Sequence, residues 1–347
     1  MLTIDTRCLQ ESFPTGVSVV AGQFITHLRA AFPHAHELTT KKSFSNTLTN
    51  VRLAFGLATI EKKSESRNVV FLPNVHFVNT HQKTMRIQVA HDLSFFHAPQ
   101  WYAPRMRAWH MLARATEQLQ TADHVIAVSE WTARGLTEFL HIPASRVHLV
   151  NPHTPVSEAP SRPEALPFPH DAPFFLFLGT LEKRKNVSSV VEAFDLIKNE
   201  PHFKNFHLAL VGRAGYGTPR ARAMSERVHH IPYVTAAEKS WFLHAARALV
   251  YPSFFEGFGL PPLEAAAAGC PSIISDCTAP QETMGDSALQ VSPYDVKQIA
   301  HAMHELGTNE LLRTEIISRG RARSAWYSVE RQREQLEPIM QIISAHI

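Results

Sequence analysis

The chain has 347 residues, 34 of them basic (Lys or Arg) and 31 acidic, so two domains of ordinary size are possible and the charge balance argues against a nucleic-acid-binding protein or an acidic tail. Its cysteines, Cys8, Cys270 and Cys277, lack metal-ligand spacing and indicate reduced thiols in a cytosolic protein. No apolar run reaches the roughly 18 to 20 residues of a membrane span, and residues 1–5 lead directly into a predicted strand, so we expect no signal peptide and a cytoplasmic location.

The first half of the chain alternates strands with helices, a pattern typical of α/β proteins with parallel sheets. The predicted elements are buried strands at 69–72, 87–90 and 124–129 and helices at 17–31 and 105–120. The region 33–67 is polar and poorly periodic, so no element is predicted there.

A proline-rich segment, residues 151–173, separates the two halves and has the composition of a semi-rigid linker. New apolar runs then predict strands at 174–179, 206–212, 248–251 and 271–275. The last predicted element is a helix over 328–347, with Ser328 as its N-cap.

These elements predict two Rossmann-like domains with a cleft between them. The predicted boundaries are 1–152 for the first domain, 153–172 for the linker, 173–327 for the second domain and 328–347 for the C-terminal helix.

The most informative stretch is 251–282, where two glutamates bracket a glycine-proline turn (EGFGLPPLEA). Proline in a first helical turn and the alanine run after it predict a helix that begins near Leu260. Glu256 then lies just before the helix and Glu264 about one turn inside it. Free amides and the helix dipole predict an anion site at Gly257, Phe258, Gly259 and Leu260, suited to a diphosphate. The two carboxylates can bind sugar and ribose hydroxyls.

Arg184 and Lys185 lie side by side in GTLEKRKN, between a predicted strand and a predicted helix. A planar guanidinium and a compact ammonium are a suitable pair for a diphosphate leaving group. A solvated basic turn is the alternative interpretation.

His91 follows the predicted strand at 87–90, and ligands of α/β sheets bind at the carboxyl ends of strands. A histidine there can donate to sugar hydroxyls and polarise them, while Asp92 is expected to orient the loop. Gly16 precedes the first long helix, where glycine permits close approach of a ligand. A structural histidine and an ordinary loop glycine remain the alternatives.

Together these strings resemble the motifs of family 4 retaining glycosyltransferases, which have the GT-B fold. The matching strings are EGFGLPPLEA, GTLEKRKN and HDLSFFHAPQWYAP. The resemblance implies that the C-terminal helix crosses back onto the first, acceptor-side domain. It also implies a metal-free donor site, and the Asp-x-Asp triplet that holds a metal in glycosyltransferases of the other common fold is absent from the sequence. The 21 histidines form no HExxH or Cys/His cluster.

Carried over residue by residue, the resemblance implies that Glu256 contacts the donor sugar and Glu264 the ribose. Arg184 and Lys185 would hold the diphosphate, and His91 would touch the sugar near the reacting carbon.

Weaker matches assign Gly16 to the diphosphate and the backbone of Tyr233 and Val234 to the nucleobase. At the position of Gly16 relatives have two adjacent glycines, and this chain has one. Glu282 would support the site.

The resemblance predicts a retaining hexosyltransferase of polysaccharide or lipopolysaccharide assembly. GDP-mannose is the first choice of donor, and a glycan or lipid-linked saccharide is the expected acceptor. UDP-glucose is the alternative donor, and a non-catalytic sugar-nucleotide-binding scaffold is the alternative function. The aromatic and arginine residues of 101–114 fit either contact with the inner face of a membrane or a helix packed on the sheet.

Overall fold

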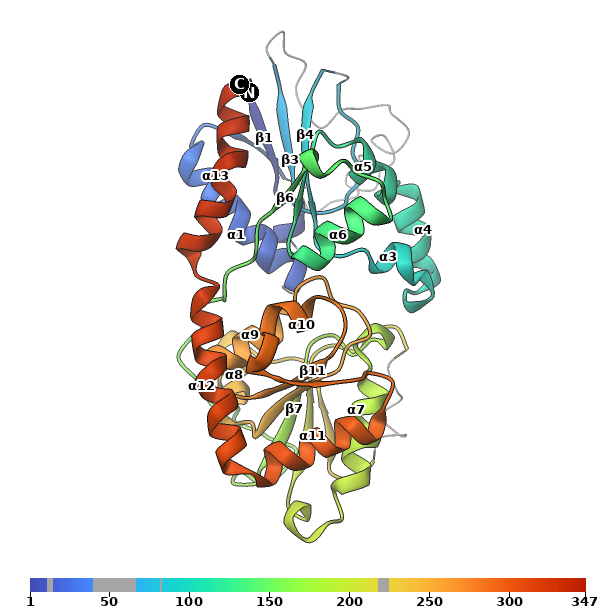
Figure 1. Cartoon of the computed structure of the whole chain (residues 1–347), viewed down its shortest axis with the longest axis vertical. Helices are drawn as coiled ribbons and strands as arrows, with labels where there is room; N and C mark the ends of the chain where they lie inside the picture. Colours follow the sequence, from blue (N-terminus) through green and yellow to red (C-terminus); the bar gives the residue numbers. More distant parts are fainter. Residues whose placement is uncertain (11–14, 40–66, 82, 218–224) are drawn as a thin grey trace. The chain divides into compact units, whose positions relative to one another are not determined.

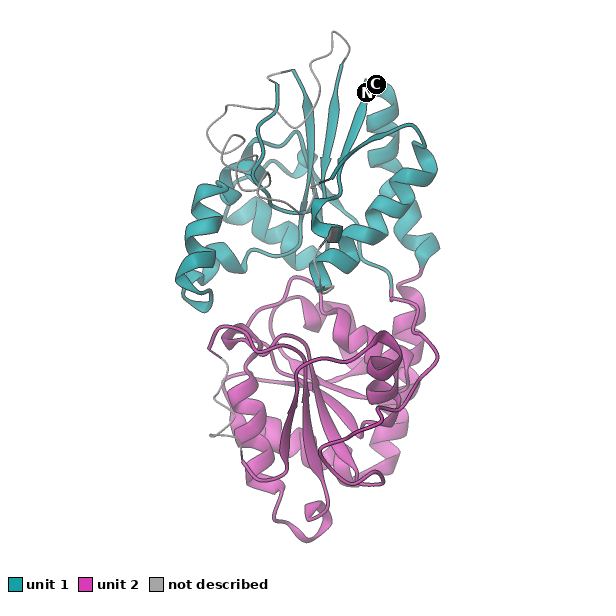
Figure 2. Cartoon of the chain, turned by 180° about the vertical axis from the view of Figure 1, so that it is seen from behind, with its two compact units in different colours: residues 1–153, 329–347 teal, residues 154–328 magenta. Residues whose placement is uncertain are grey.

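The computed structural model describes residues 1–10, 15–39, 67–81, 83–217 and 225–347. They form two compact units, coloured separately in Figure 2: residues 1–153 with 329–347, and residues 154–328.

The first unit contains a six-stranded sheet in which all neighbouring strands are parallel (Figure 1). In sheet order the strands are β2 (His36–Leu38), β1 (Leu2–Asp5), β3 (Val69–Leu72), β4 (Met85–Ala90), β5 (His124–Ala127) and β6 (Val147–Leu149). The helices are α1 (Gly16–Ala31), α3 (Ser94–His97), α4 (Pro104–Leu112), α5 (Ala115–Thr121), α6 (Glu130–Glu138) and α13 (Val329–His346). The predicted strands at 69–72, 87–90 and 124–129 are confirmed. Residues 40–66 lie outside the described part of the chain.

One predicted helix of this unit is wrong. The stretch 105–120 is two helices, α4 and α5, because Arg114 between them has a left-handed backbone with φ of 53°. Such a conformation ends a right-handed helix. Arginine gives no local sign of it.

The C-terminal helix α13 packs within the first unit, as the resemblance implied. Gln332 Nε2 donates to Gln23 Oε1 of α1 at 3.0 Å and to the Asn151 carbonyl at 3.1 Å. Gln335 exchanges two hydrogen bonds with Asn151, and Leu336 is fully buried beneath the helix.

The second unit contains another parallel six-stranded sheet. In sheet order its strands are β12 (Leu289–Val291), β11 (Ser272–Ser275), β10 (Ala248–Tyr251), β7 (Phe174–Leu178), β8 (His207–Val211) and β9 (Val228–Ile231). Its helices are α7 (Val187–Ile197), α8 (Ala236–Ala245), α9 (Leu260–Ala267), α10 (Ala279–Met284), α11 (Val296–Thr308) and α12 (Glu310–Trp326). Strand order reverses between β7 and β10, and α/β sheets bind ligands at the carboxyl ends of strands beside such a reversal.

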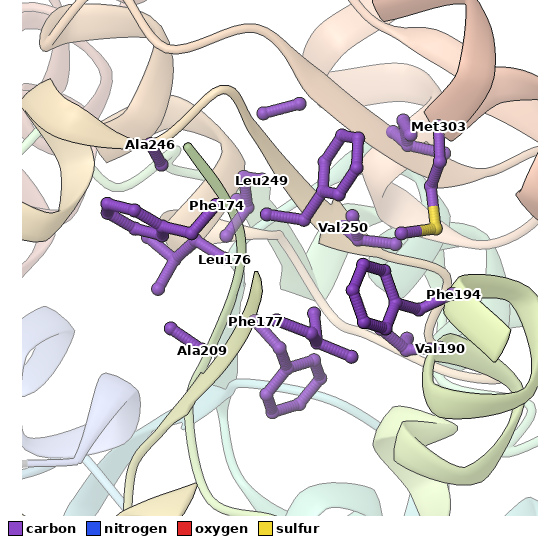
Figure 3. Close-up of a cluster of buried hydrophobic side chains, with 14 of the residues drawn as sticks. Phe174, Leu176, Phe177, Val190, Phe194, Ala209, Ala246, Leu249, Val250 and Met303 are labelled. Atoms are coloured by element: carbon purple, nitrogen blue, oxygen red, sulfur yellow. The ribbon is translucent and has the colours of Figure 1, made fainter. Parts of the chain in front are cut away.

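The core of the second unit explains why its strands are continuous apolar runs. All five residues of β7 are buried, as expected for a parallel strand covered on both faces. Figure 3 shows Phe194 of α7 and Met303 of α11 beside Val250 of β10. Phe174 and Leu176 of β7 belong to the same buried cluster.

The proline-rich segment after residue 153 packs on the second unit, although it forms neither helix nor strand. Phe168 is buried and stacks on His207, with 5.2 Å between ring centroids. Arg162 lies over the Trp241 ring, and Ser157 Oγ donates to Ser240 Oγ at 2.8 Å. Most residues from 156 to 171 are nevertheless exposed, as the composition of a solvated linker predicts, and Phe168 is a buried exception.

Candidate functional site

The turn after β7 positions Arg184 and Lys185. Residues Lys183–Lys185 form one turn of 3-10 helix, followed by Asn186 with a left-handed φ of 58°. The Asn186 amide is buried and donates to the carbonyls of Pro252, at 3.1 Å, and Pro293. Asparagine tolerates this backbone, and its side chain fixes the turn against the loop after β10.

The loop after β10 leads into α9, which begins at Leu260 as predicted. Gly259 precedes the helix with φ of 102°, and a Cβ there would lie 3.3 Å from Pro280. Only glycine satisfies both the left-handed backbone and the close approach. Because Pro261 and Pro262 have no N–H, the first turn offers fewer amides to an anion than a general helix start. The Leu260 amide and those of the preceding glycine loop are the donors that remain.

These two loops bring Arg184, Lys185 and Glu256 together beside the β7–β10 reversal. Glu256 Oε2 lies 3.0 Å from Arg184 Nη1, and Glu256 Oε1 lies 3.0 Å from Lys185 Nζ. Tyr251, the last residue of β10, donates its hydroxyl to Glu256 Oε1 at 2.8 Å. All four side chains are largely buried, so their charges interact in a poorly screened environment.

Further hydrogen bonds hold the Arg184 guanidinium in the cluster. Its Nη1 also donates to the Phe255 carbonyl at 2.7 Å, and its Nη2 donates to Glu182 Oε1 at 2.9 Å. The backbone joins the same loops, since the Phe254 amide donates to the Arg184 carbonyl at 2.9 Å. Neither loop can move without disturbing the other.

The protonation states of the cluster follow from these contacts. Burial alone would raise the pKa of Glu256, but Arg184 and Lys185, with hydrogen bonds from Lys185 and Tyr251, lower it to about 2. Burial opposes charge on Lys185, yet the neighbouring Glu256 carboxylate raises the pKa of this ammonium. Burial and the same carboxylate raise the pKa of Tyr251. At neutral pH Glu256 is therefore an acceptor for hydroxyl groups, beside two cations and a phenol.

Glu264 lies one turn into α9, where its Oε1 is 2.7 Å from Lys239 Nζ of α8. Tyr251 and Lys239 were not predicted as site residues. The sequence pattern that could have identified Tyr251 is a polar aromatic residue at the end of a buried apolar strand. No local pattern marks Lys239, which reaches Glu264 from a neighbouring helix.

Three of the weaker predictions, Tyr233, Val234 and Glu282, fall on the second unit. Tyr233 and Val234 lie in the loop between β9 and α8; Tyr233 is exposed, and Val234 packs partly on the core. Glu282 is in the first turn of α10, and its carbonyl accepts from Arg323 Nη2 at 2.7 Å.

His91 and Asp92 belong to the first unit, directly after β4. The His91 Nε2 atom lies 2.6 Å from the Pro73 carbonyl. Because a carbonyl can only accept, Nε2 carries the proton, and Nδ1 of the neutral ring is an acceptor. Burial lowers the pKa of His91 from its ordinary value of 6.5, outweighing the Pro73 hydrogen bond. Asp92 Oδ1 accepts a hydrogen bond from the Ser94 amide at 2.8 Å, which holds the loop.

Gly16 is the first residue of α1, after the N-cap Thr15. Its φ is not positive, and a Cβ there would meet no described atom within 4 Å. The described part of the first unit therefore gives no reason for glycine at this position.

The described residues hold neither a metal-ligand cluster nor a membrane-spanning helix. No group of three or more His, Cys, Asp or Glu residues is arranged to hold a metal ion. No helix there is both long and apolar enough to cross a bilayer.

Comparison with known proteins agrees with this geometry. The model of the "Glycosyl transferases group 1" family matches residues 159–323. The chain is 30% identical over 268 residues to "O-antigen chain mannosyltransferase B" of Escherichia coli, covering 74% of this chain and 70% of the relative. The chain belongs to this glycosyltransferase family.

Other members of the family and a solved structure extend the comparison. The glycosyltransferase is 25% identical over 223 residues to "O-antigen chain mannosyltransferase RfbU" of Salmonella typhimurium, covering 62% of this chain and 59% of that one. Sucrose-phosphate synthase from Thermosynechococcus elongatus superposes with a TM-score of 0.70 at 16% identity, covering 99% of both chains. The fold is therefore GT-B, and the enzyme is a glycosyltransferase.

Proposed function

We propose that this glycosyltransferase moves mannose from GDP-mannose onto a glycan or lipid-linked saccharide, with retention at the anomeric carbon and without a metal ion. The observation that carries the proposal is the cluster of Glu256 with Arg184 and Lys185 beside the β7–β10 reversal. The O-antigen mannosyltransferases among its relatives support mannose as the sugar.

In the proposed reaction, the bond from the anomeric carbon to the diphosphate oxygen breaks and its electron pair stays on the diphosphate. Arg184 and Lys185, with the amides of Gly257, Phe258, Gly259 and Leu260, stabilise that departing charge. The acceptor hydroxyl bonds to the anomeric carbon on the same face and gives its proton to the departing phosphate oxygen. Two fixed cations supply the charge stabilisation that a divalent metal supplies elsewhere.

Glu256 binds sugar hydroxyls in this proposal, and Glu264 binds those of the ribose. Donor binding exchanges one set of partners for another: the diphosphate takes up Arg184 and Lys185, and the sugar hydroxyls donate to Glu256. In the free chain the low pKa of Glu256 keeps it ionised, as an acceptor of sugar hydroxyls must be, so the proposal gives it no role as a general acid.

The remaining contacts are proposed from the family resemblance. The backbone of Tyr233 and Val234 contacts the nucleobase, Gly16 approaches the diphosphate, and Glu282 supports the site. His91 aligns the sugar by accepting a hydroxyl hydrogen bond at Nδ1.

The test is a donor panel in the presence of EDTA. GDP-mannose, UDP-glucose and their relatives are incubated with saccharide acceptors, and NMR of the product reads the anomeric configuration. Transfer from GDP-mannose with retention supports the proposal. Transfer from UDP-glucose establishes the alternative donor, and binding without turnover on a broad acceptor panel establishes the scaffold function.

We also propose that α4 rests on an anionic membrane surface. No residue of α4 is buried. Pro104, Ala108, Met111 and Leu112 are exposed and follow the i, i+4, i+7, i+8 spacing that aligns on one helix face. Arg105 and Arg107, also exposed, fall on opposite sides of that strip.

Residues 93–116 contain no aspartate or glutamate, so this face is basic as well as apolar. An apolar strip between cations is the geometry of a helix lying in a membrane interface. The alternative of packing on the unit holds for Trp109 and His110 of α4. The Trp109 ring meets Phe77 edge-on with centroids 5.9 Å apart, and the His110 ring lies 5.3 Å from that of Phe95.

Vesicle co-sedimentation tests this surface, with phosphatidylcholine alone or mixed with phosphatidylglycerol. We expect binding to the mixed vesicles, abolished by the double variant Met111→Asp and Leu112→Asp. Leu311→Asp, which changes an exposed leucine of α12, is the matched control. Equal binding by all three proteins, or none by the parent chain, would remove the membrane from the proposal.

A further inference from the structure

The C-terminal end of α12 is hydrogen-bonded to the backbone beside residues 254–260, which contain the glycine loop before α9 and are called the donor loop below. Arg323 Nε donates to the Thr283 carbonyl of α10 at 2.6 Å, and its Nη2 donates to the Glu282 carbonyl at 2.7 Å. Thr283 Oγ1 in turn donates to the Phe258 carbonyl at 2.7 Å. Arg323 is thus connected through α10 to the glycine loop between Glu256 and Glu264.

A ring contact makes a second connection between the same parts. The Phe258 and Tyr327 rings meet edge to face, with centroids 5.3 Å apart and an interplanar angle of 87°. Both side chains are buried, and the Arg323 guanidinium lies over the Tyr327 ring at 5.2 Å. Edge-to-face packing of this kind fixes the mutual orientation of two rings. The donor loop therefore rests directly on the residue that follows α12.

Tyr327 also lies where the chain passes between its two units. The chain leaves the first unit after His153 and returns to it at Val329. The two passing segments are hydrogen-bonded to each other: the Thr154 amide donates to the Tyr327 carbonyl, and Thr154 Oγ1 donates to the Ser324 carbonyl, both at 2.8 Å. One residue, Tyr327, carries contacts to both the donor loop and the paired segments.

We propose that Arg323 and Tyr327 are positioning residues that couple the donor loop to the paired segments at Thr154 and Tyr327. Donor binding, which orders the loop, then also stabilises the paired segments, and loosening the segments weakens donor binding. Such coupling is reciprocal, so either effect requires the other. The inference rests on the proposed donor site for its ligand but not for its contacts.

Hydrogen exchange on the full chain tests the coupling first without ligand. In Tyr327→Leu we expect faster amide exchange both in the loop 254–260 and at Thr154, because the ring contact that anchors the loop is lost. Tyr327→Phe keeps the ring and should exchange as the parent does. Leu311→Ala, on the exposed face of α12, is the matched control for a change in that helix. Faster exchange at only one of the two places would overturn the coupling.

The second measurement uses GDP at saturation. We expect slower exchange at Thr154 in the parent chain and less slowing in Tyr327→Leu. Arg323→Gln loses the charge-assisted hydrogen bonds to the Thr283 and Glu282 carbonyls and to the Tyr327 hydroxyl. For this variant we expect a rise of about tenfold in KM for the donor with an unchanged KM for the acceptor. Arg323→Lys should recover part of the loss. Equal rises in both KM values would mark a merely structural role and overturn the assignment.

Failure of GDP to bind the parent chain would contradict the proposed donor and leave the coupling to be decided by exchange in the free protein. The two proposals can therefore fail separately.

Discussion

The two units place similar ion pairs beside their strand-order reversals, with different surroundings. In the first unit, the Arg7 guanidinium binds Asp5 through two hydrogen bonds and donates from Nη1 and Nη2 to the Phe77 carbonyl. In the second, Arg184 and Lys185 share one carboxylate, Glu256. Four side-chain hydrogen bonds hold Arg7 to its own chain. In the proposed function, the cations of the second group also bind the diphosphate of the donor.

The comparison shows that the same sheet topology can carry either an ion pair that holds a loop in place or a binding site. The buried Arg7 contacts the loop at 73–78 through the Phe77 carbonyl, and the same loop contacts His91 through the Pro73 carbonyl. A buried carboxylate with two cations and a phenol stays ionised and can exchange partners. The five predictions below test this contrast, from the largest expected effect to the smallest.

Removing Arg7 should cost stability without affecting nucleotide binding. In Arg7→Ala, Asp5 is left buried and uncompensated, so we expect the free energy of unfolding to fall by about 3–5 kcal/mol. Urea denaturation measures the loss, and GDP affinity should stay within about twofold. Arg29→Ala breaks an exposed pair with Glu37 and should cost at most about 1 kcal/mol. Equal losses of unfolding free energy in both variants would contradict a stabilising role of the buried Arg7–Asp5 pair.

Removing Lys185 should lower the transfer rate and leave the chain folded, in contrast to the removal of Arg7. Loss of one preformed charge donor at the departing diphosphate predicts a transfer rate about 10²- to 10³-fold lower. Initial rates with GDP-mannose measure it, with circular dichroism to establish that the variant is folded. Lys183→Ala removes an exposed lysine of the same turn and should change the rate by only a few-fold. Similar losses in the two variants would refute a specific role for Lys185.

Acid should weaken the Glu256 cluster in a defined pH window. The pKa of Glu256 is about 2 in the folded chain against an ordinary 4.5, so its contribution to stability is complete above pH 4.5 and is lost as the pH falls toward 2. The shift corresponds to about 3 kcal/mol. Urea unfolding of the parent and Glu256→Gln should converge as the pH falls through this window. A constant difference between them would contradict the assigned ion pairs.

Protonation of His91 should lower the transfer rate only on the acid side. Its pKa lies below 6.5, so the neutral ring persists at pH 7 and above, and Nδ1 loses its lone pair only at lower pH. One lost hydrogen bond predicts a decrease of about tenfold. The His91→Asn variant should transfer more slowly than the parent at neutral pH, and its rate should not show this further decrease at low pH. If the rate of the variant still decreased at low pH, the decrease would belong to the protonation of another group.

Gly16→Ala should have the smallest effect on the fold. Since no described atom would touch the new methyl group, helix α1 should be unchanged or stabilised by up to about 1 kcal/mol. If the donor approaches Gly16, transfer should still fall by a few-fold. Unchanged transfer would leave Gly16 outside the site.

Sequence reasoning predicted the parts of the molecule whose signals are local. The apolar run at 174–179 and the glycine-proline turn before Leu260 specify a buried strand and a helix start within a few residues. Contacts between distant segments have no such signal. The pairing of Lys239 with Glu264, the anchoring of Phe258 by Tyr327 and the left-handed Arg114 all depend on tertiary packing.

Charge pairing in the site was also hidden from the sequence. Arg184, Lys185 and Glu256 were predicted separately, as phosphate and sugar ligands, and their mutual ion pairs come from the adjacency of β7 and β10. Whether a cation faces a ligand or a neighbouring carboxylate depends on that adjacency.

The most direct test of the donor site is thermal melting of the parent chain and Lys185→Ala with GDP and GDP-mannose in EDTA. A ligand at about 100 times its dissociation constant adds roughly 2.7 kcal/mol of stability. We predict such a shift for the parent chain and a much smaller one for Lys185→Ala at the same concentration. Equal shifts in both proteins, or none with any nucleotide, would contradict a donor site built on Lys185, Arg184 and Glu256.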